Sequence, residues 1–132
     1  MTDRISIEVR RSFLGRVRGT GSARDGVHHW YVERITALAL VPLTLWFIFS
    51  MIALAGAAQP VVAHWIGRPW NAVLLLATIA MTFQHMQLGL QVVIEDYVHE
   101  PLTQRLAILA VKGGTLLLAL FAALSVLKLA LA

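Results

Sequence analysis

The sequence contains no cysteine and few charged residues. Without cysteine, the 132-residue chain can form neither a disulfide nor a thiolate metal site, and it has no cysteine nucleophile. Charged residues make up 14% of the chain and hydrophobic residues 58%, and the mean hydropathy is +0.74. A soluble domain has about a quarter charged residues, and a water-soluble core of this length cannot bury so much apolar side chain. The composition therefore predicts an integral membrane protein with a single domain.

The few charges are unevenly distributed along the chain. The formal net charge is +4, and six arginines precede the first apolar stretch: Arg4, Arg10, Arg11, Arg16, Arg18 and Arg24. Beside a membrane span, a basic segment more often sets topology and contacts anionic lipid than binds nucleic acid. Its acidic residues argue against a transit peptide, and the apolar run after it is too long for a signal peptide. We predict a basic cytoplasmic segment at 1–25 and no nucleic-acid partner.

Three long apolar runs predict three membrane-crossing helices. The predicted spans are at about 30–58, 66–95 and 104–131, and each exceeds the roughly 20 residues that a helix needs to cross the hydrocarbon core. Run length and the lack of strict alternation favour helices over strands. The predicted fold class is therefore all-α, with a three-helix membrane domain at 26–132.

The arginines also predict the orientation of the chain. By the positive-inside rule the N-terminus is cytoplasmic and the C-terminus periplasmic, in a bacterial inner membrane. The connection between the second and third spans is then cytoplasmic, so Asp96, Tyr97 and Arg34 are expected on that side. Lys112 lies within the third span, and two alternatives stay open for it: snorkelling to the interface or facing an anionic partner group.

A lone histidine, His85, stands near the middle of the second span. Gly89, one turn away, removes a side chain where a flat ligand or a helix can approach. One interpretation is an interhelical hydrogen bond, with Gln84, Gln87 and Gln91 as polar packing contacts. The other is an axial ligand of haem iron, because neutral imidazole is a common iron ligand. Zinc is disfavoured, since no second ligand stands three or four residues away.

The remaining histidines restrict the haem hypothesis. His28, His29, His64 and His99 fall near span ends or in connections. A second ligand at the depth of His85 therefore has to come from another chain. Three spans alone are also too few helices to enclose a porphyrin. If haem is bound, the sequence predicts an obligate membrane partner.

Acidic residues and a tyrosine end the second span, in the stretch IEDYVHEP. Such residues are common at a membrane interface, which is the ordinary interpretation. Carboxylates at a helix C-terminus oppose the helix dipole, and a cation such as Arg34 would offset that cost. A tyrosine hydroxyl here can donate to the carbonyl of a lipophilic ligand such as a quinone. Asp96 and Tyr97 are thus also candidate quinone contacts, near the water that must supply protons.

Two stretches, DGVHHWYVERITALALVPL and HMQLGLQVVIEDYVHEPLTQRL, resemble the D-type membrane anchor subunit of succinate dehydrogenase, respiratory complex II. The resemblance covers about residues 25–131. Each motif is weak alone, but their order on three spans is fairly specific. The matching positions are Gly26, Val27, His28, Arg34, His85, Asp96, Tyr97, Val98, Pro101, Arg105 and Leu106.

The resemblance implies a subunit without catalytic residues of its own in a redox complex, so it leaves open whether the chain counts as an enzyme. His85 would ligate the iron of haem b, which is shared with a C-type, cytochrome b556-like anchor subunit. Tyr97 would donate to a ubiquinone carbonyl and Asp96 would support that site. Arg34 and His28 would meet haem propionates or membrane lipid. A flavoprotein and an iron–sulfur subunit would dock on the cytoplasmic side, linking the tricarboxylic acid cycle to the aerobic respiratory chain.

Two positions depart from the family pattern, and two alternatives compete with it. His29 replaces an acid found in some relatives, and an extra residue stands at His99–Glu100. The chain could instead anchor a fumarate reductase, because the partner subunits set the direction of the reaction. A small homo-oligomeric transporter subunit is the other alternative; it requires charged residues within the spans and repeated segments, and neither is clear in the sequence.

Overall fold

A computed structural model describes the backbone of residues 22–131 and the side chains of residues 26–131. It contains α2 (Ser22–Ala53), α3 (Gln59–Gly67), α4 (Pro69–Tyr97) and α5 (Pro101–Ala130), joined by short connections. Within the described residues, three segments are long and apolar enough to cross a membrane: Gly26–Ala53, Pro69–Tyr97 and Pro101–Ala130. The predicted all-α class with three spans is confirmed. Most of the predicted segment 1–25 lies outside the described residues.

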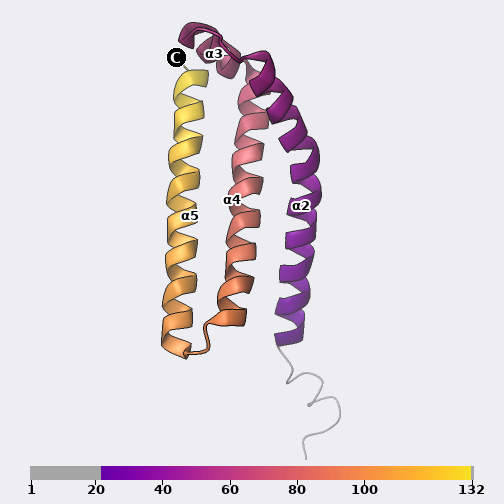
Figure 1. The fold of residues 1–132 in the computed structure, drawn as a ribbon, viewed down its shortest axis with the longest axis vertical. Helices are drawn as coiled ribbons and strands as arrows, with labels where there is room; N and C mark the ends of the chain where they lie inside the picture. Colours follow the sequence, from indigo (N-terminus) through magenta and orange to yellow (C-terminus); the bar gives the residue numbers. More distant parts are fainter. Residues whose placement is uncertain (1–21, 132) are drawn as a thin grey trace, which may run out of the picture.

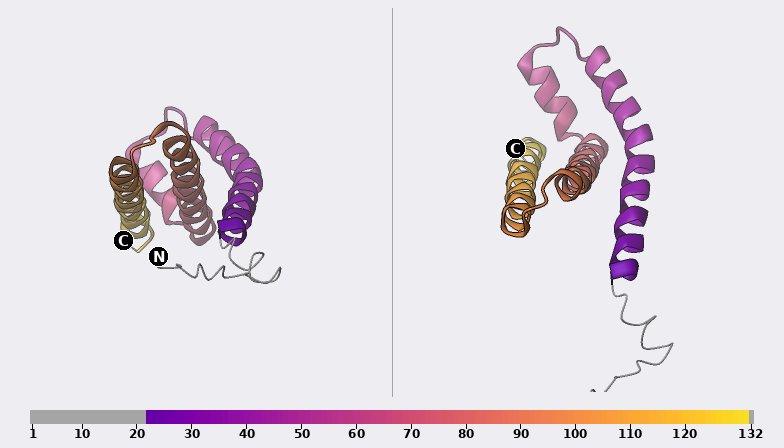
Figure 2. Two further views of the ribbon diagram at one scale, coloured as in Figure 1. Left: turned by 90° about the horizontal axis from the view of Figure 1, so that it is seen from below. Right: turned by 60° about the horizontal axis from the view of Figure 1, so that its bottom comes forward.

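The three long helices lie side by side with α4 in the middle (Figure 1). Both α2 and α5 pack against α4, but within the described part of the chain they do not contact each other. Viewed from the end, the helices form a shallow arc and not a closed bundle (Figure 2). Among residues 26–131, few are buried in such an arrangement: Thr36, Ala72, Leu75, Leu88, Thr115 and Val126.

Proline marks the beginning of three helices. Pro60, Pro69 and Pro101 stand in the first turns of α3, α4 and α5, where a helix has no use for the N–H that proline lacks. The turn after α2 contains Gly56 at a φ of 78°, a conformation that glycine adopts without steric cost. Pro42 lies inside α2, which bows along its length (Figure 1). A proline there removes one backbone hydrogen bond and bends the helix.

The short helix α3 fills a connection that the predicted spans at 30–58 and 66–95 do not anticipate. It lies across the ends of α4 and α5 (Figure 1). The side chain of Asn71 donates a 2.7 Å hydrogen bond from Nδ2 to the carbonyl oxygen of Trp65. The ring of Trp65 stacks on that of Trp46 with 5.7 Å between centroids. These contacts depend on tertiary packing, so a hydropathy pattern does not reveal them.

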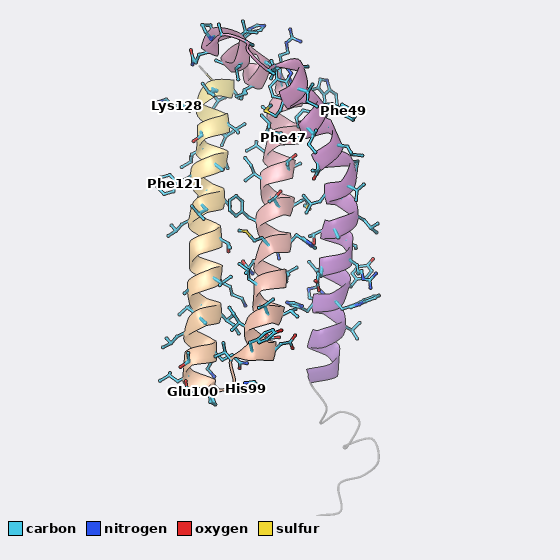
Figure 3. The ribbon with its side chains drawn as sticks, in the orientation of Figure 1. Phe47, Phe49, His99, Glu100, Phe121 and Lys128 are labelled. Carbon is cyan, nitrogen blue, oxygen red and sulfur yellow. The ribbon has the colours of Figure 1, made fainter. Side chains whose placement is uncertain are left out.

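Most large apolar side chains are exposed when the chain is considered alone. Leu38 is 71% exposed and Phe121 is 69% exposed, and Phe121 points away from the other helices (Figure 3). A soluble monomer rarely exposes so much continuous apolar surface. Lipid tails or other membrane helices are the surroundings that suit these helices.

Candidate functional site

His85 lies near the middle of α4, twelve residues before the last residue of the helix, Tyr97. A helix rises about 1.5 Å per residue, so the separation is roughly 18 Å. The imidazole is half-buried at the contact with α2, and its Nδ1 lies 3.1 Å from Oγ1 of Thr36. Thr36 is only 4% exposed. The structure therefore contains the interhelical hydrogen bond of the first interpretation, and it engages one of the two ring nitrogens.

A shallow apolar groove of about 400 Å³ opens beside the His85 ring. Its other wall comes from α2: Ala37, Leu40, Val41, Thr44 and Leu45. A single imidazole on a largely apolar wall would suit a protein ligand of haem iron. Among the described residues, no group of three or more histidine or acidic side chains is arranged to hold a metal ion. Among the residues that line this groove, His85 is the one with a nitrogen that can bind a metal.

The Thr36–His85 contact also defines the register of α2 and α4. The helices are antiparallel, so residues before Thr36 are level with residues after His85. A second groove, of about 650 Å³, agrees with this register; it is lined by Gly26, His29, Trp30, Glu33, Gln91, Val92 and Glu95. By the same count Arg34 is level with Gln87, and Asp96 lies nine residues farther along α4, or roughly 13 Å.

The second groove contains a polar atom without a partner. Nε2 of His29 is buried and has no hydrogen bond within the described part of the chain. Buried polar atoms are nearly always hydrogen-bonded, so this one calls for a partner from outside the described residues. The sequence identified His29 only as a departure from the family pattern. The burial of this nitrogen depends on the α2–α4 packing.

The candidate residues nearer the end of α4 are exposed. Tyr97 is 79% exposed, and Asp96 and His28 are also exposed. The guanidinium carbon of Arg34 lies 5.2 Å from the centroid of the Trp30 ring, a cation–π contact. The structure thus brings Asp96 and Tyr97 together through adjacency on α4, but it does not bring Arg34 to Asp96.

Two other acids of this region have structural partners. Glu95 accepts a 2.7 Å hydrogen bond from Nε2 of Gln91. Glu100 is the N-cap of α5 and accepts from the backbone N–H groups of Leu102 and Thr103. Hydrogen bonds from the side chain and backbone of Thr103, and then from the backbone of Leu102, hold the pKa of the Glu100 carboxyl below its usual value. The residue that departs from the family pattern therefore caps a helix.

The opposite side of α4 shows the packing role that the sequence suggested for the glutamines. Oε1 of Gln87 lies 3.3 Å from Oγ1 of Thr115 on α5, and Thr115 is 6% exposed. Gln84, by contrast, is exposed. Lys112, one turn before Thr115, is exposed as well, so both alternatives for it stay open.

Comparison with known proteins identifies the family. The model of the succinate dehydrogenase/fumarate reductase transmembrane subunit family matches residues 9–124. The chain belongs to this family. The resemblance seen in the sequence is thereby confirmed, and the redox-anchor hypothesis is favoured over a transporter subunit.

Curated relatives of this family member carry consistent names. The succinate dehydrogenase hydrophobic membrane anchor subunit of Rickettsia bellii is 36% identical over 77% of this chain and 82% of its own length. That of Rickettsia conorii is 33% identical over 63% of this chain and 67% of its own length. The succinate dehydrogenase membrane anchor subunit of Reclinomonas americana is 28% identical over 67% of this chain and 77% of its own length. No solved structure is a significant match to this chain.

Sequence reasoning missed the parts played by Thr36 and Glu100. A threonine in an apolar run carries no signal of its own, because its partner depends on which residue of α4 lies opposite. Glu100 directly before Pro101 was a usable signal for a helix start, although glutamate is not among the commonest N-cap residues.

Proposed function

We propose that this chain is the D-type membrane anchor subunit of a succinate:ubiquinone oxidoreductase in a bacterial inner membrane. Together with a C-type, cytochrome b556-like anchor subunit, it holds haem b and forms the membrane site where ubiquinone is reduced. A flavoprotein and an iron–sulfur subunit dock on its cytoplasmic side and supply electrons from succinate. Family membership supports the assignment to this complex, and the names of the relatives favour succinate oxidation over fumarate reduction.

The observation that carries the haem part of the proposal is the position of His85. Its Nδ1 is engaged by Thr36, and the ring borders an apolar groove near the middle of α4. In this proposal the other nitrogen, Nε2, would bind the haem iron, and the α2 wall of the groove would keep water away from that side. When bound, haem supplies a one-electron redox centre in the membrane. The partner anchor would supply a further ligand and the opposite wall.

The quinone part of the proposal concerns the exposed end of α4. The Tyr97 hydroxyl donates to the quinone oxygen on which negative charge develops, and Asp96 orients the site electrostatically. Both lie at a helix end, where water can deliver the protons that quinone reduction consumes. Arg34 and His28, exposed on α2, meet the haem propionates or lipid phosphates.

The orientation of the chain follows from the arginines that precede the first span. The cytoplasmic leaflet favours such a basic segment. The α4–α5 connection, with Asp96 and Tyr97 before it, then lies on the same side as the soluble subunits. Trp65 and Trp70 suit the opposite, periplasmic interface.

The proposal is tested by a His85→Gln variant of the whole complex, expressed with its partner subunits. Glutamine can keep a hydrogen bond to Thr36, so helix packing and assembly are expected to survive, but its amide is a poor ligand for haem iron. Reduced-minus-oxidised spectra of the purified complex should lose the six-coordinate haem b signal.

The control is His99→Gln, which changes an exposed histidine in the α4–α5 connection and should leave the haem spectrum intact. An assembled His85→Gln complex with the haem spectrum of the wild type would show that His85 is not a ligand.

A further inference from the structure

Thr36 has three polar neighbours around one hydroxyl group. Its Oγ1 lies 2.9 Å from the carbonyl oxygen of Val32, 2.9 Å from that of Glu33 and 3.1 Å from Nδ1 of His85. A hydroxyl has one proton to donate and can accept two hydrogen bonds. The single proton of Thr36 therefore cannot serve all three neighbours, and where it goes decides the protonation of the imidazole.

The two carbonyl oxygens can only accept, whereas the ring nitrogen can donate or accept. If the ring proton is on Nδ1, it is donated to Oγ1, and the hydroxyl proton goes to a carbonyl of its own helix, as is common for helical threonine. If the ring proton is on Nε2, the hydroxyl proton must turn to Nδ1. The lone pairs of Oγ1 would then face two carbonyl oxygens at 2.9 Å. The first arrangement supplies two protons to the three contacts, whereas the second supplies only one, so the first is favoured.

We infer that Thr36 is a positioning residue, which holds His85 as the Nδ1-protonated tautomer and so leaves the lone pair of Nε2 free for haem iron. The inference rests on the proposed function, because it takes His85 as the axial ligand. A neutral imidazole has one N–H, and the two ring nitrogens point in different directions. The nitrogen directed away from Thr36 is therefore the one that can bind iron.

Because Thr36 is buried, its hydrogen bond to His85 affects how the imidazole would bind haem iron. Histidine ligands of metals commonly donate their other N–H, which fixes the ring plane and raises the basicity of the ligating nitrogen. Thr36 is 4% exposed, so no water replaces its oxygen easily. Without it, Nδ1–H stays unpaired in an apolar setting, which is unfavourable. The ring becomes free to turn, and a less basic ligand favours the reduced iron.

The test compares Thr36→Val with Thr36→Ser in the assembled complex. Valine keeps the shape of the side chain but removes the hydroxyl, whereas serine keeps the hydroxyl. Thr36→Val should raise the haem midpoint potential. The ratio of reduced to oxidised haem at a fixed potential should rise roughly twofold to tenfold, the equivalent of one hydrogen bond. The electron paramagnetic resonance signal of the oxidised haem should also shift, because the ring plane changes.

Two controls separate this role from helix packing. Thr36→Ser should restore the potential and the resonance signal of the wild type. Thr115→Val removes the same group from the α4–α5 contact, away from His85, and should leave both unchanged. If Thr36→Val prevents assembly, Thr36→Ala is measured in its place with the same expectation.

The outcomes distinguish the inference from the proposed function. A wild-type potential and resonance signal in the assembled Thr36→Val or Thr36→Ala complex overturn the inference, while His85→Gln still tests the ligand itself. If His85→Gln keeps the haem spectrum of the wild type, the haem proposal and the inference both fail.

Discussion

The central helix α4 contacts its two neighbours through the same type of side chain. Thr36 on α2 and Thr115 on α5 are 4% and 6% exposed, and each is within hydrogen-bonding distance of a carbonyl of its own helix. Each also reaches one polar residue of α4, which is His85 for the first and Gln87 for the second. These partners are two residues apart in sequence but about 200° apart around the helix axis.

The difference between the two contacts lies in what remains after the hydrogen bond is made. The α4–α5 contact also includes a small apolar core of Ala72, Leu75 and Val126. On the α2 side, the His85 ring keeps a second nitrogen and borders a groove of about 400 Å³. A polar contact between membrane helices is therefore no sign of a site by itself. A side chain that keeps a second coordinating atom beside an apolar groove is the more specific sign of a binding site.

The largest expected effect is that of Tyr97→Phe at the end of α4, which would sharpen the comparison between the two sides of this helix. Tyr97 lies roughly 120° from His85 and about 80° from Gln87 around the axis, so position alone assigns it to neither side. Tyr97→Phe keeps the ring and removes a hydrogen bond to a charging quinone oxygen. That loss costs about 1.5–3 kcal/mol, or roughly tenfold to a hundredfold in kcat/KM for ubiquinone. Quinone reductase assays of the purified complex measure it.

The controls for this prediction measure whether the electron-transfer steps before quinone reduction are intact. Haem content and succinate oxidation by an artificial acceptor that bypasses the membrane should match the wild type. Tyr31→Phe removes the hydroxyl of the other tyrosine, which is 57% exposed on α2, and should leave the rate unchanged. A wild-type ubiquinone rate in Tyr97→Phe would remove the tyrosine from the quinone site.

A moderate effect is expected for Thr115→Val, which tests whether the contact between α4 and α5 serves packing alone. Thr115→Val removes the hydrogen bond to Gln87, and interhelical hydrogen bonds in membranes contribute about 0.6 kcal/mol, reaching about 1.7 in the strongest cases. We expect a small fall in the unfolding midpoint of the complex in denaturant, with no change in the haem spectrum. A haem midpoint shift as large as that of Thr36→Val would break the comparison, because both sides of α4 would then serve the cofactor.

The smallest effect concerns the cap that begins α5. The pKa of Glu100 is lower in the folded state. Its ionised form therefore stabilises the fold fully above the usual glutamate pKa of about 4.3, and the contribution disappears as the pH falls through the lower, folded-state value. Thermal unfolding should show Glu100→Gln slightly less stable than the wild type at neutral pH. The difference should vanish in acid.

Glu95→Gln is the matched control for the cap, because the Glu95 carboxylate caps no helix and, within the described residues, accepts a hydrogen bond only from the side chain of Gln91. A difference between Glu100→Gln and the wild type that persists unchanged into acid would contradict the role given to the carboxylate charge.

The spans were predictable because each depends on a long run of similar residues. Hydropathy predicted three spanning helices and the described residues contain three, with bounds that differ from the predicted ones: α2 ends at Ala53 and α4 begins at Pro69. The connection was harder, since α3 depends on the Gly56 turn and on tryptophan packing. Of the candidate site, the position of His85 within its span was predictable from counting residues. The partner of Arg34 was not, because the reach of a long side chain depends on its neighbours, here Trp30.

Composition and order alone determined that this chain is a three-span membrane protein with one histidine deep in its second span. Each of these properties depends on residues close together in the sequence or on a sum over the chain, so it can be predicted without knowledge of the fold. Only the tertiary structure decided that Thr36 faces His85 and that Thr115 faces Gln87. Register between two helices results from many weak apolar contacts along their whole length, and no single stretch of sequence encodes it.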